Sequence, residues 1–170
     1  MEVLFLLLHL SFALLLFFLV LAFITGAPYV PTDNPAADSM IRLARIKKGS
    51  LVMDLGSGDG KLLLRAAQAG AGRAIGYEIN PYLALFSNVR SMRSSYKKIM
   101  HTYWRNFWRA DISSADVVFV YLLPWRMDAL ARKLKRELKP GAIVVSNSFI
   151  FPNWNIIRQD DKHHIYVFKA

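Results

Sequence analysis

The fold is decided by residues 52–61, which have the sequence VMDLGSGDGK. A short apolar run that leads into a glycine-rich turn and then into a helix forms a nucleotide-type pocket at the carboxyl end of a parallel strand. Glycine is required in such a turn because a Cβ would block the ligand and because some positions need a positive φ. The stretch therefore predicts an α/β domain with a ligand site at this turn. A glycine-rich turn that serves only the fold is the alternative.

Three kinds of glycine-rich turn can be compared with this stretch. A P-loop needs a Ser or Thr directly after its Lys, and Leu62 stands there instead. A dinucleotide-binding fingerprint needs its third glycine at the position of Lys61. The remaining pattern is D-x-G-x-G-x-G, starting at Asp54. It favours a ligand with a cationic amino-acid head group, such as S-adenosylmethionine (AdoMet), whose ammonium group Asp54 can bind directly or through water.

A second acidic residue, Glu78, closes the next apolar run in the sequence GYEIN at residues 76–80. A carboxylate at the end of a second parallel strand can accept hydrogen bonds from both hydroxyls of a ribose. Asp54 and Glu78 therefore predict one site at neighbouring strand ends.

The rest of the chain alternates strand and helix patterns. Strands are predicted at residues 51–55, 74–79, 99–104, 117–123 and 142–149. Helices are predicted at residues 36–46, 61–69, from 81 onward and 126–138. A final hairpin is predicted from 156–159 and 164–168. These elements indicate a doubly wound, Rossmann-like α/β sheet with an antiparallel C-terminal edge.

Residues 3–25 form an apolar run in which only His9, Ser11 and Thr25 are polar. At about 1.5 Å per residue, roughly twenty such residues span the ~30 Å hydrocarbon core of a bilayer. A cleaved signal peptide is the alternative, but it would have a basic start and a shorter apolar run. We therefore predict a transmembrane anchor at 1–26, a connector and pre-domain helix at 27–50, and the α/β domain at 51–170.

The charge of the chain is strongly positive, at +10, and four basic residues follow the apolar run closely: Arg42, Arg45, Lys47 and Lys48. The positive-inside rule then predicts a single-pass membrane protein whose α/β domain faces the cytoplasm, or the matrix if the membrane is mitochondrial. The basic surface favours contact with anionic lipids over a nucleic-acid partner. The absence of cysteine excludes a disulfide framework and a cysteine-ligated zinc site.

Several motifs together resemble a known family. DLGSGDG at 54–60 and GYEINP at 76–81 are similar to the AdoMet-binding motifs of seven-β-strand methyltransferases. PYVPT at 28–32 resembles the pre-domain motif of a lysine methyltransferase group, which includes small archaeal protein lysine methyltransferases and membrane-anchored mitochondrial enzymes acting on the ADP/ATP carrier and on a subunit of ATP synthase. Other segments resemble the same group: NFWRADIS at 106–113, LKRELKPG at 134–141, VSNSF at 145–149 and FPNW at 151–154.

The resemblance implies a seven-stranded methyltransferase sheet, AdoMet as the cofactor, no metal, and a protein lysine on a membrane-embedded substrate as the methyl acceptor. It implies AdoMet contacts at Asp54, Gly56, Gly58, Glu78 and Asn106. Asn106 is a departure, because many members of the superfamily have an acid there to bind the adenine amino group. Tyr29 and Thr32 are expected to cover the cofactor, with Tyr29 also positioning the acceptor.

An aromatic channel would favour the neutral form of the acceptor lysine by desolvation and tolerate the methylammonium product. Further candidates for its lining are Tyr121, Phe149 and Trp154, for which ordinary core packing is the alternative. A small-molecule or lipid N-methyltransferase, an RNA methyltransferase and a non-catalytic AdoMet-binding scaffold remain as other functions. The sequence YLLPW at 121–125 matches poorly the N-P-P-[YF] motif of an RNA methyltransferase.

Overall fold

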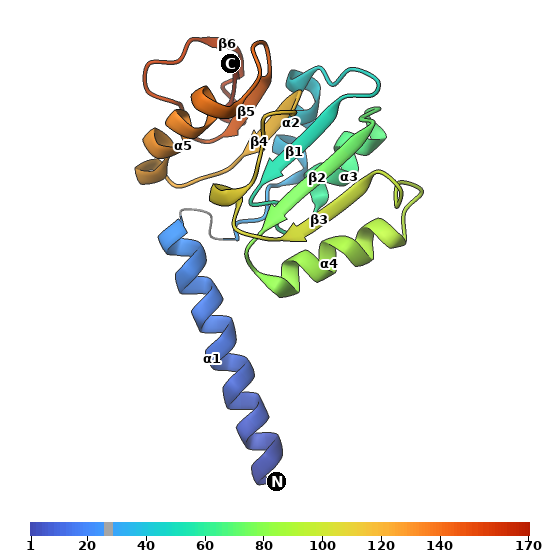
Figure 1. Cartoon of the computed structure of the whole chain (residues 1–170), viewed down its shortest axis with the longest axis vertical. Coiled ribbons are helices and arrows are strands. Elements are labelled where there is room, and N and C mark those ends of the chain that lie inside the picture. Colours follow the sequence, from blue (N-terminus) through green and yellow to red (C-terminus); the bar gives the residue numbers. More distant parts are fainter. Residues whose placement is uncertain (26–28) are drawn as a thin grey trace.

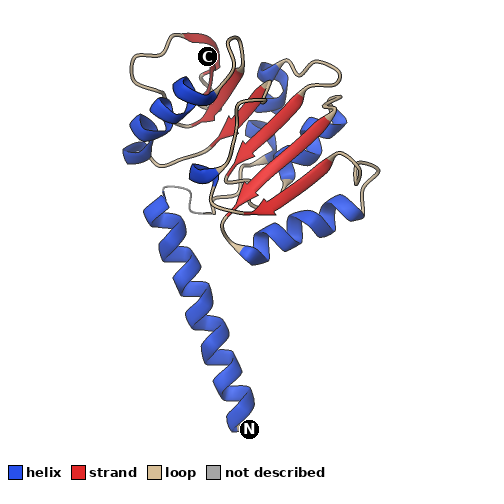
Figure 2. Cartoon of the chain, in the orientation of Figure 1, coloured by secondary structure: helices blue, strands red, loops and turns tan. Residues whose placement is uncertain are grey.

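The computed structural model describes residues 1–25 and 29–170. Across these residues the chain forms one seven-stranded sheet in the order β3-β2-β1-β4-β5-β7-β6 (Figures 1 and 2). The neighbouring pairs among β1 to β5 are parallel, and β7 runs antiparallel to both β5 and β6. The strands are β1 Leu51–Leu55, β2 Arg73–Glu78, β3 Met100–Trp104, β4 Val117–Val120, β5 Ile143–Asn147, β6 Ile156–Asp160 and β7 Ile165–Lys169.

Helices cover both faces of the sheet because successive residues of a strand point to opposite sides. On one face, α2 and α3 pack on a cluster that includes Val52 of β1, whereas Met53 belongs to the cluster on the other face, under α5. Helix α4 packs on β3, at the edge of the sheet. The helical elements are α1 Glu2–Thr25, α2 Asn34–Ala44, α3 Lys61–Gln68, α4 Pro81–Met92, the short 3-10 helix η1 Phe107–Arg109, and α5 Pro124–Glu137.

The alternating α/β order and the antiparallel final hairpin are confirmed, with shifts of a few residues at the element ends. Helix α2 begins at Asn34, two residues before the expected start, because Asp33 caps it by accepting a hydrogen bond from the Ala36 backbone N–H. Strand β4 ends at Val120 and α5 begins at Pro124, so residues 121–123 connect the two elements and do not extend the strand.

Helix α2 belongs to the packed unit, although the predicted division places it in the connector at 27–50. Its residues Ala37, Met40 and Ala44 are buried, in one cluster with Val52 and Phe119 of the sheet. The predicted boundary between residues 26 and 27 lies outside the described residues. The division of the chain into three parts stays a prediction.

Helix α1 extends away from the sheet, as Figure 1 shows. Its segment Glu2–Val20 has a mean hydropathy of 2.9 and is long enough to cross a membrane, by length and composition only. Of its described side chains, only Phe18 is buried, and the Phe18 ring lies edge-on to Trp104 with the centroids 6.5 Å apart. Near the end of the helix, Nε of Arg126 donates to the Ile24 carbonyl at 3.0 Å. The helix therefore meets the domain at the carboxyl end of β3 and at the start of α5.

Candidate ligand site at the glycine-rich turn

The glycine-rich turn follows β1 and folds over the end of β2. Gly56, Gly58 and Gly60 have φ values of 93°, 52° and 75°, a left-handed conformation that other residues rarely adopt. The backbone N–H groups of Gly56 and Ser57 both donate to the Tyr77 carbonyl, at 2.9 and 3.1 Å. The positive φ angles bend the chain back so that these bonds to the neighbouring strand can form.

Glu78, at the end of β2, binds the glycine-rich turn through its carboxylate. One carboxylate oxygen accepts a hydrogen bond from the Gly58 N–H at 2.8 Å, and the other accepts one from the Asn80 N–H, also at 2.8 Å. Burial raises the pKa of this carboxyl, while the backbone donors act in the opposite direction. Glu78 therefore connects the turn to the start of α4 and keeps acceptor capacity for a ligand.

Asp54 is a buried carboxylate at the end of β1, with a relative exposure of 5%. No hydrogen bond or ion pair to its side chain exists among residues 1–25 and 29–170. Burial, together with the charges of Glu78 and Asp59, raises its pKa to about 8. By contrast, Asp59 has a cation partner in Arg90, at 2.9 Å. A bound cation at Asp54 would offset the cost of burying its charge.

The segment before α2, from Tyr29 to Thr32, covers the glycine-rich turn. The Tyr29 ring lies against the turn so closely that a Cβ added at Gly58 would be 2.9 Å from its Cε2 atom. Lys61, the first residue of α3, donates from Nζ to the Thr32 carbonyl at 2.6 Å. Of the predicted motif at 28–32, Pro28 lies outside the described residues. The remaining four residues are held on the turn by Lys61 and by the packing of Tyr29.

These parts line a cavity whose empty space, including its open mouth, is about 560 Å³. Within it the hydroxyl oxygen of Ser57 is buried and has no hydrogen-bond partner among the described residues. The cavity is lined by Tyr29, Val30, Pro31, Thr32, Asp54, Gly56, Ser57, Gly58, Asp59, Lys61, Leu62, Glu78, Val120 and Tyr121. The site thus offers two buried carboxylates, an unpaired hydroxyl and two tyrosine rings to one ligand.

Most of the residues predicted for the site line this cavity, and three do not. Those brought together are Tyr29, Thr32, Asp54, Gly56, Gly58, Glu78 and Tyr121. Asn106 instead caps η1, with its side-chain oxygen accepting from the Trp108 N–H at 3.0 Å. Phe149 packs against the core cluster under α5. Roles for these residues remain predictions.

Trp154 lies away from the cavity, among other aromatic side chains. Its ring centroid is 5.3 Å from that of Phe151 and 6.0 Å from that of Phe168, and Lys135 lies over its ring. Its indole nitrogen is buried without a hydrogen-bond partner in the described part of the chain. Its role in an acceptor channel stays a prediction.

The sequence did not identify the contributions of Lys61, Ser57 and Arg90. Lys61 stands out in the sequence only as the residue that excludes a dinucleotide fingerprint, yet it fixes the segment above the turn. The sequence carries no signal for this contact, because the two residues are 29 positions apart and the acceptor is a backbone carbonyl. No group of three metal-ligating side chains occurs in the part of the chain that the structure describes.

The fold and the site define the class of the protein. A parallel sheet with an antiparallel edge, a glycine-rich turn after β1 and a carboxylate ending β2 form the arrangement of an α/β methyltransferase domain. The sequence model of the ANTKMT methyltransferase domain matches residues 54–158. The chain belongs to this family, so the recognition made from the sequence motifs is confirmed.

Proteins of similar sequence agree with this membership. The ATP synthase subunit-C lysine N-methyltransferase of Homo sapiens is 35% identical over 127 residues, covering 75% of this chain and 54% of that protein. A protein-lysine N-methyltransferase of Saccharolobus islandicus is 32% identical over 155 residues, covering 87% of this chain and 96% of that protein. The chain thus spans about half the length of the human relative and nearly all of the archaeal one.

A solved structure of similar shape is that of an RNA methyltransferase from Salinibacter ruber in complex with S-adenosyl-L-homocysteine. It is 34% identical, has a TM-score of 0.77, and the match covers 82% of this chain and 92% of that one. The fold of this chain is therefore that of an α/β methyltransferase domain, with an apolar helix before it.

The buried Asp54 predicts a pH-dependent stability of the ligand-free protein. Its pKa is raised from 3.8 to about 8 in the folded state, so between these values the folded protein binds more protons than the unfolded chain. The free energy of unfolding should therefore fall as the pH rises through this window, by a few kcal/mol at about 1.4 kcal/mol per pKa unit. Asp54→Asn should be the more stable form at pH 8 and should lose this part of the pH dependence.

Chemical denaturation of the full chain in detergent between pH 5 and 9 measures this effect. Asp128→Asn, at an exposed position of α5, is the matched control and should follow the unsubstituted protein. If the free energy of unfolding of Asp54→Asn changes with pH in parallel with that of the unsubstituted protein, the Asp54 carboxylate does not have a raised pKa in the folded state.

Proposed function

We propose that this chain is an AdoMet-dependent methyltransferase whose acceptor is a lysine side chain of a protein. The observation that carries the proposal is the buried Asp54 carboxylate beside Glu78 at the glycine-rich turn, which has no partner among the described residues. Relatives named as protein-lysine N-methyltransferases, at 32–35% identity, support the choice of acceptor.

The residues of the cavity fit AdoMet in four respects. Asp54 can neutralise a cationic ammonium, and Glu78 can accept ribose hydroxyls with the lone pairs that its two backbone contacts leave free. The buried Ser57 hydroxyl needs a partner that a polar ligand would supply. The lack of a Cβ at Gly58 leaves room for the close approach of Tyr29, which would cover the ligand.

Methyl transfer needs positioning more than acid–base chemistry. When bound, AdoMet supplies a methyl group on a positively charged sulfur, and the acceptor nitrogen displaces that sulfur in line. The chain must hold the acceptor amine neutral and aligned, which is worth several kcal/mol of the barrier. Tyr29 and Tyr121, which both line the cavity, are the aromatic side chains placed to desolvate the amine.

The same proposal assigns parts of the chain to the membrane. Helix α1 is the anchor, the methyltransferase domain faces the cytoplasm or matrix, and the substrate is a membrane-associated protein. The apolar segment Glu2–Val20 supports this assignment, since its 19 residues would measure about 28 Å along a helix. The basic residues that follow α1 support the orientation. We retain the division into an anchor at 1–26, a connector at 27–50 and a catalytic domain at 51–170.

Methylation of RNA is a second candidate function. The similarity to the Salinibacter ruber RNA methyltransferase and the net charge of +10 favour it. A lipid or other small-molecule acceptor would use the same cofactor site.

The identity of the labelled product tests these functions against one another. The full chain, reconstituted in membranes that contain their native proteins and supplemented with total RNA, is incubated with AdoMet carrying a radioactive methyl group. We expect the label in protein, resistant to ribonuclease, and recovered as methyllysine after acid hydrolysis. Asp54→Asn should lose most of this labelling because the cofactor head group loses its counter-charge, whereas Asp128→Asn should retain it.

Label in RNA would establish the second candidate, and label in the organic phase would establish a lipid acceptor. Absence of label, together with cofactor binding by calorimetry, would indicate a binding protein without activity. Each of these results would overturn the proposal that the acceptor is a protein lysine.

Tyr29 should affect turnover more than cofactor affinity if it positions the acceptor. Tyr29→Ala is expected to lower kcat on the order of 10²-fold, because misplaced reactants lose alignment in the transition state. Tyr29→Phe should retain most activity if the ring acts by packing, and should resemble Tyr29→Ala if the hydroxyl is needed. Steady-state kinetics with calorimetric AdoMet affinities separates these effects. Full activity of Tyr29→Ala would remove the residue from the acceptor channel.

The orientation of the domain can be measured independently of activity. In sealed vesicles with their cytoplasmic face outward, a protease added outside should digest the domain, because the basic residues after α1 favour that side. Detergent-permeabilised vesicles are the control for protease access. Protection of the domain in intact vesicles would reverse the proposed orientation.

A further inference from the structure

Helix α4 packs on the sheet with its small side chains and exposes its large apolar ones. The buried side consists of Ala84, Ser87 and Ser91, and the two serines hydrogen-bond to β3. The side away from the sheet carries Tyr82, Leu85, Phe86 and Met92, of which Leu85 and Met92 are each 63% exposed. At 100° per residue these four positions fall within about 120° of the helix circumference, the width of a stripe that a helix normally buries.

The neighbouring end of β3 extends this apolar surface. Trp104 is a large aromatic residue, yet it is 65% exposed. Together with the four outward residues of α4 it forms what we call the α4 face. Exposed apolar surface of this extent usually marks a contact with a partner or a membrane.

The sequence segment that carries the α4 face has charges of one sign only. Residues 79–110, which span α4, β3 and η1, contain no Asp or Glu and carry six basic residues: Arg90, Arg93, Lys97, Lys98, Arg105 and Arg109. Arg90 lies over the Phe86 ring, 5.4 Å from its centroid, and pairs with Asp59. The other five are exposed. An exposed apolar surface on a segment that has basic residues and no acidic ones complements an anionic lipid surface.

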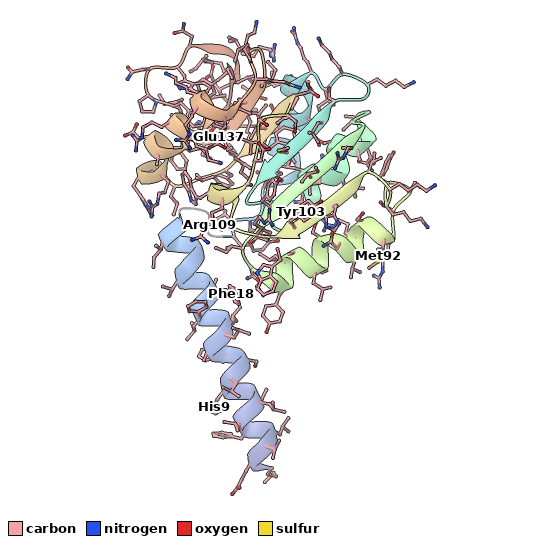
Figure 3. All side chains as sticks on the ribbon, in the orientation of Figure 1. His9, Phe18, Met92, Tyr103, Arg109 and Glu137 are labelled. Atoms are coloured by element: carbon pink, nitrogen blue, oxygen red, sulfur yellow. The ribbon has the colours of Figure 1, made fainter. Side chains whose placement is uncertain are left out.

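Helix α1 places the α4 face at the depth of a membrane surface. Phe18 of α1 contacts Trp104 and lies seven residues before the end of α1 at Thr25, in the part of the helix nearest the domain. Trp and Tyr are enriched at this level of a bilayer. Figure 1 shows α4 along the edge of the domain from which α1 leaves, and Figure 3 shows Phe18 on α1 and Met92 at the end of α4 that lies farther from α1.

We infer that the α4 face docks on the surface of the bilayer that α1 spans, with α4 lying in the head-group region of an anionic membrane. This inference rests on the proposed role of α1 as a membrane anchor. Docking fixes the domain in two places, so that the end of the sheet carrying the cofactor cavity faces the lipid. A flexible tether would leave the cavity free to turn away, whereas the docked domain presents it to acceptors at the membrane surface.

Fluorescent labels at single cysteines test this docking, since the chain contains no cysteine of its own. Four full-length variants are compared: Leu85→Cys and Met92→Cys on the α4 face, Leu10→Cys on α1, and Lys48→Cys in the exposed loop before β1 as the matched control. Each is labelled with an environment-sensitive dye and reconstituted in phosphatidylcholine–phosphatidylglycerol vesicles. Quenching is measured with lipids brominated near the head group or deep in the acyl chain, and with aqueous iodide.

We expect the labels at positions 85 and 92 to lose most fluorescence to the shallow brominated lipid, and the label at position 10 to the deep one. The label at position 48 should respond to iodide alone. If positions 85 and 92 respond only to iodide while position 10 is quenched by lipid, the docking is wrong and the anchor stands. Shielding of both α4 labels from lipid and iodide would show a protein partner or second copy there, and would also overturn the docking. If position 10 is not quenched by lipid, the anchor itself fails and the docking with it.

Discussion

The structure depends on the close approach of the glycine-rich turn to the end of β2. Hydrogen bonds from Gly56, Ser57 and Gly58 to the Tyr77 carbonyl and the Glu78 carboxylate draw the turn over that strand. The approach leaves no room for a side chain at Gly76, where a Cβ would lie 2.4 Å from the Ser57 hydroxyl. Asp54 and Glu78 are brought to one cavity by this contact, and both are buried by it. The perturbed acidity of Asp54 is therefore a consequence of how the turn is packed.

The same constraint extends to α4. A Cβ at Gly60 would lie 2.1 Å from the Ser87 hydroxyl, so the inner side of α4 can carry only small residues where it meets the turn. Ser87 and Ser91 satisfy their hydroxyls on β3, which fixes the helix without large apolar contacts. The large apolar residues of α4 are consequently left on its outer side. The exposed face that we assign to the membrane and the compact binding turn thus arise from one packing requirement.

Much of the fold follows from local sequence, because the strands are short apolar runs and the helices have caps and prolines at their starts. The ends of β1 and the start of α4 were predicted to the residue for this reason. Asp54 and Glu78 could be placed in one site because parallel strands end at the same edge. Other features depend on tertiary contacts that periodicity does not encode. Lys61 hydrogen-bonds to the Thr32 carbonyl, and Asn106 caps η1. Helix α4 exposes its large apolar residues, although their helical spacing alone would predict that they are buried.

Sequence proximity was also a poor guide to which charges lie near α1. Arg45 and Lys47 follow α1 closely along the chain, yet they line a separate cavity with Lys139 and Gly141, at the amino ends of β1 and β5. Helix α1 instead contacts Trp104 at the carboxyl end of β3. The cations nearest to that contact in sequence, such as Arg105, come from the acid-free segment 79–110. Net charge alone therefore favours a lipid surface without locating it, whereas the fold puts the apolar and basic surface on the side from which α1 leaves.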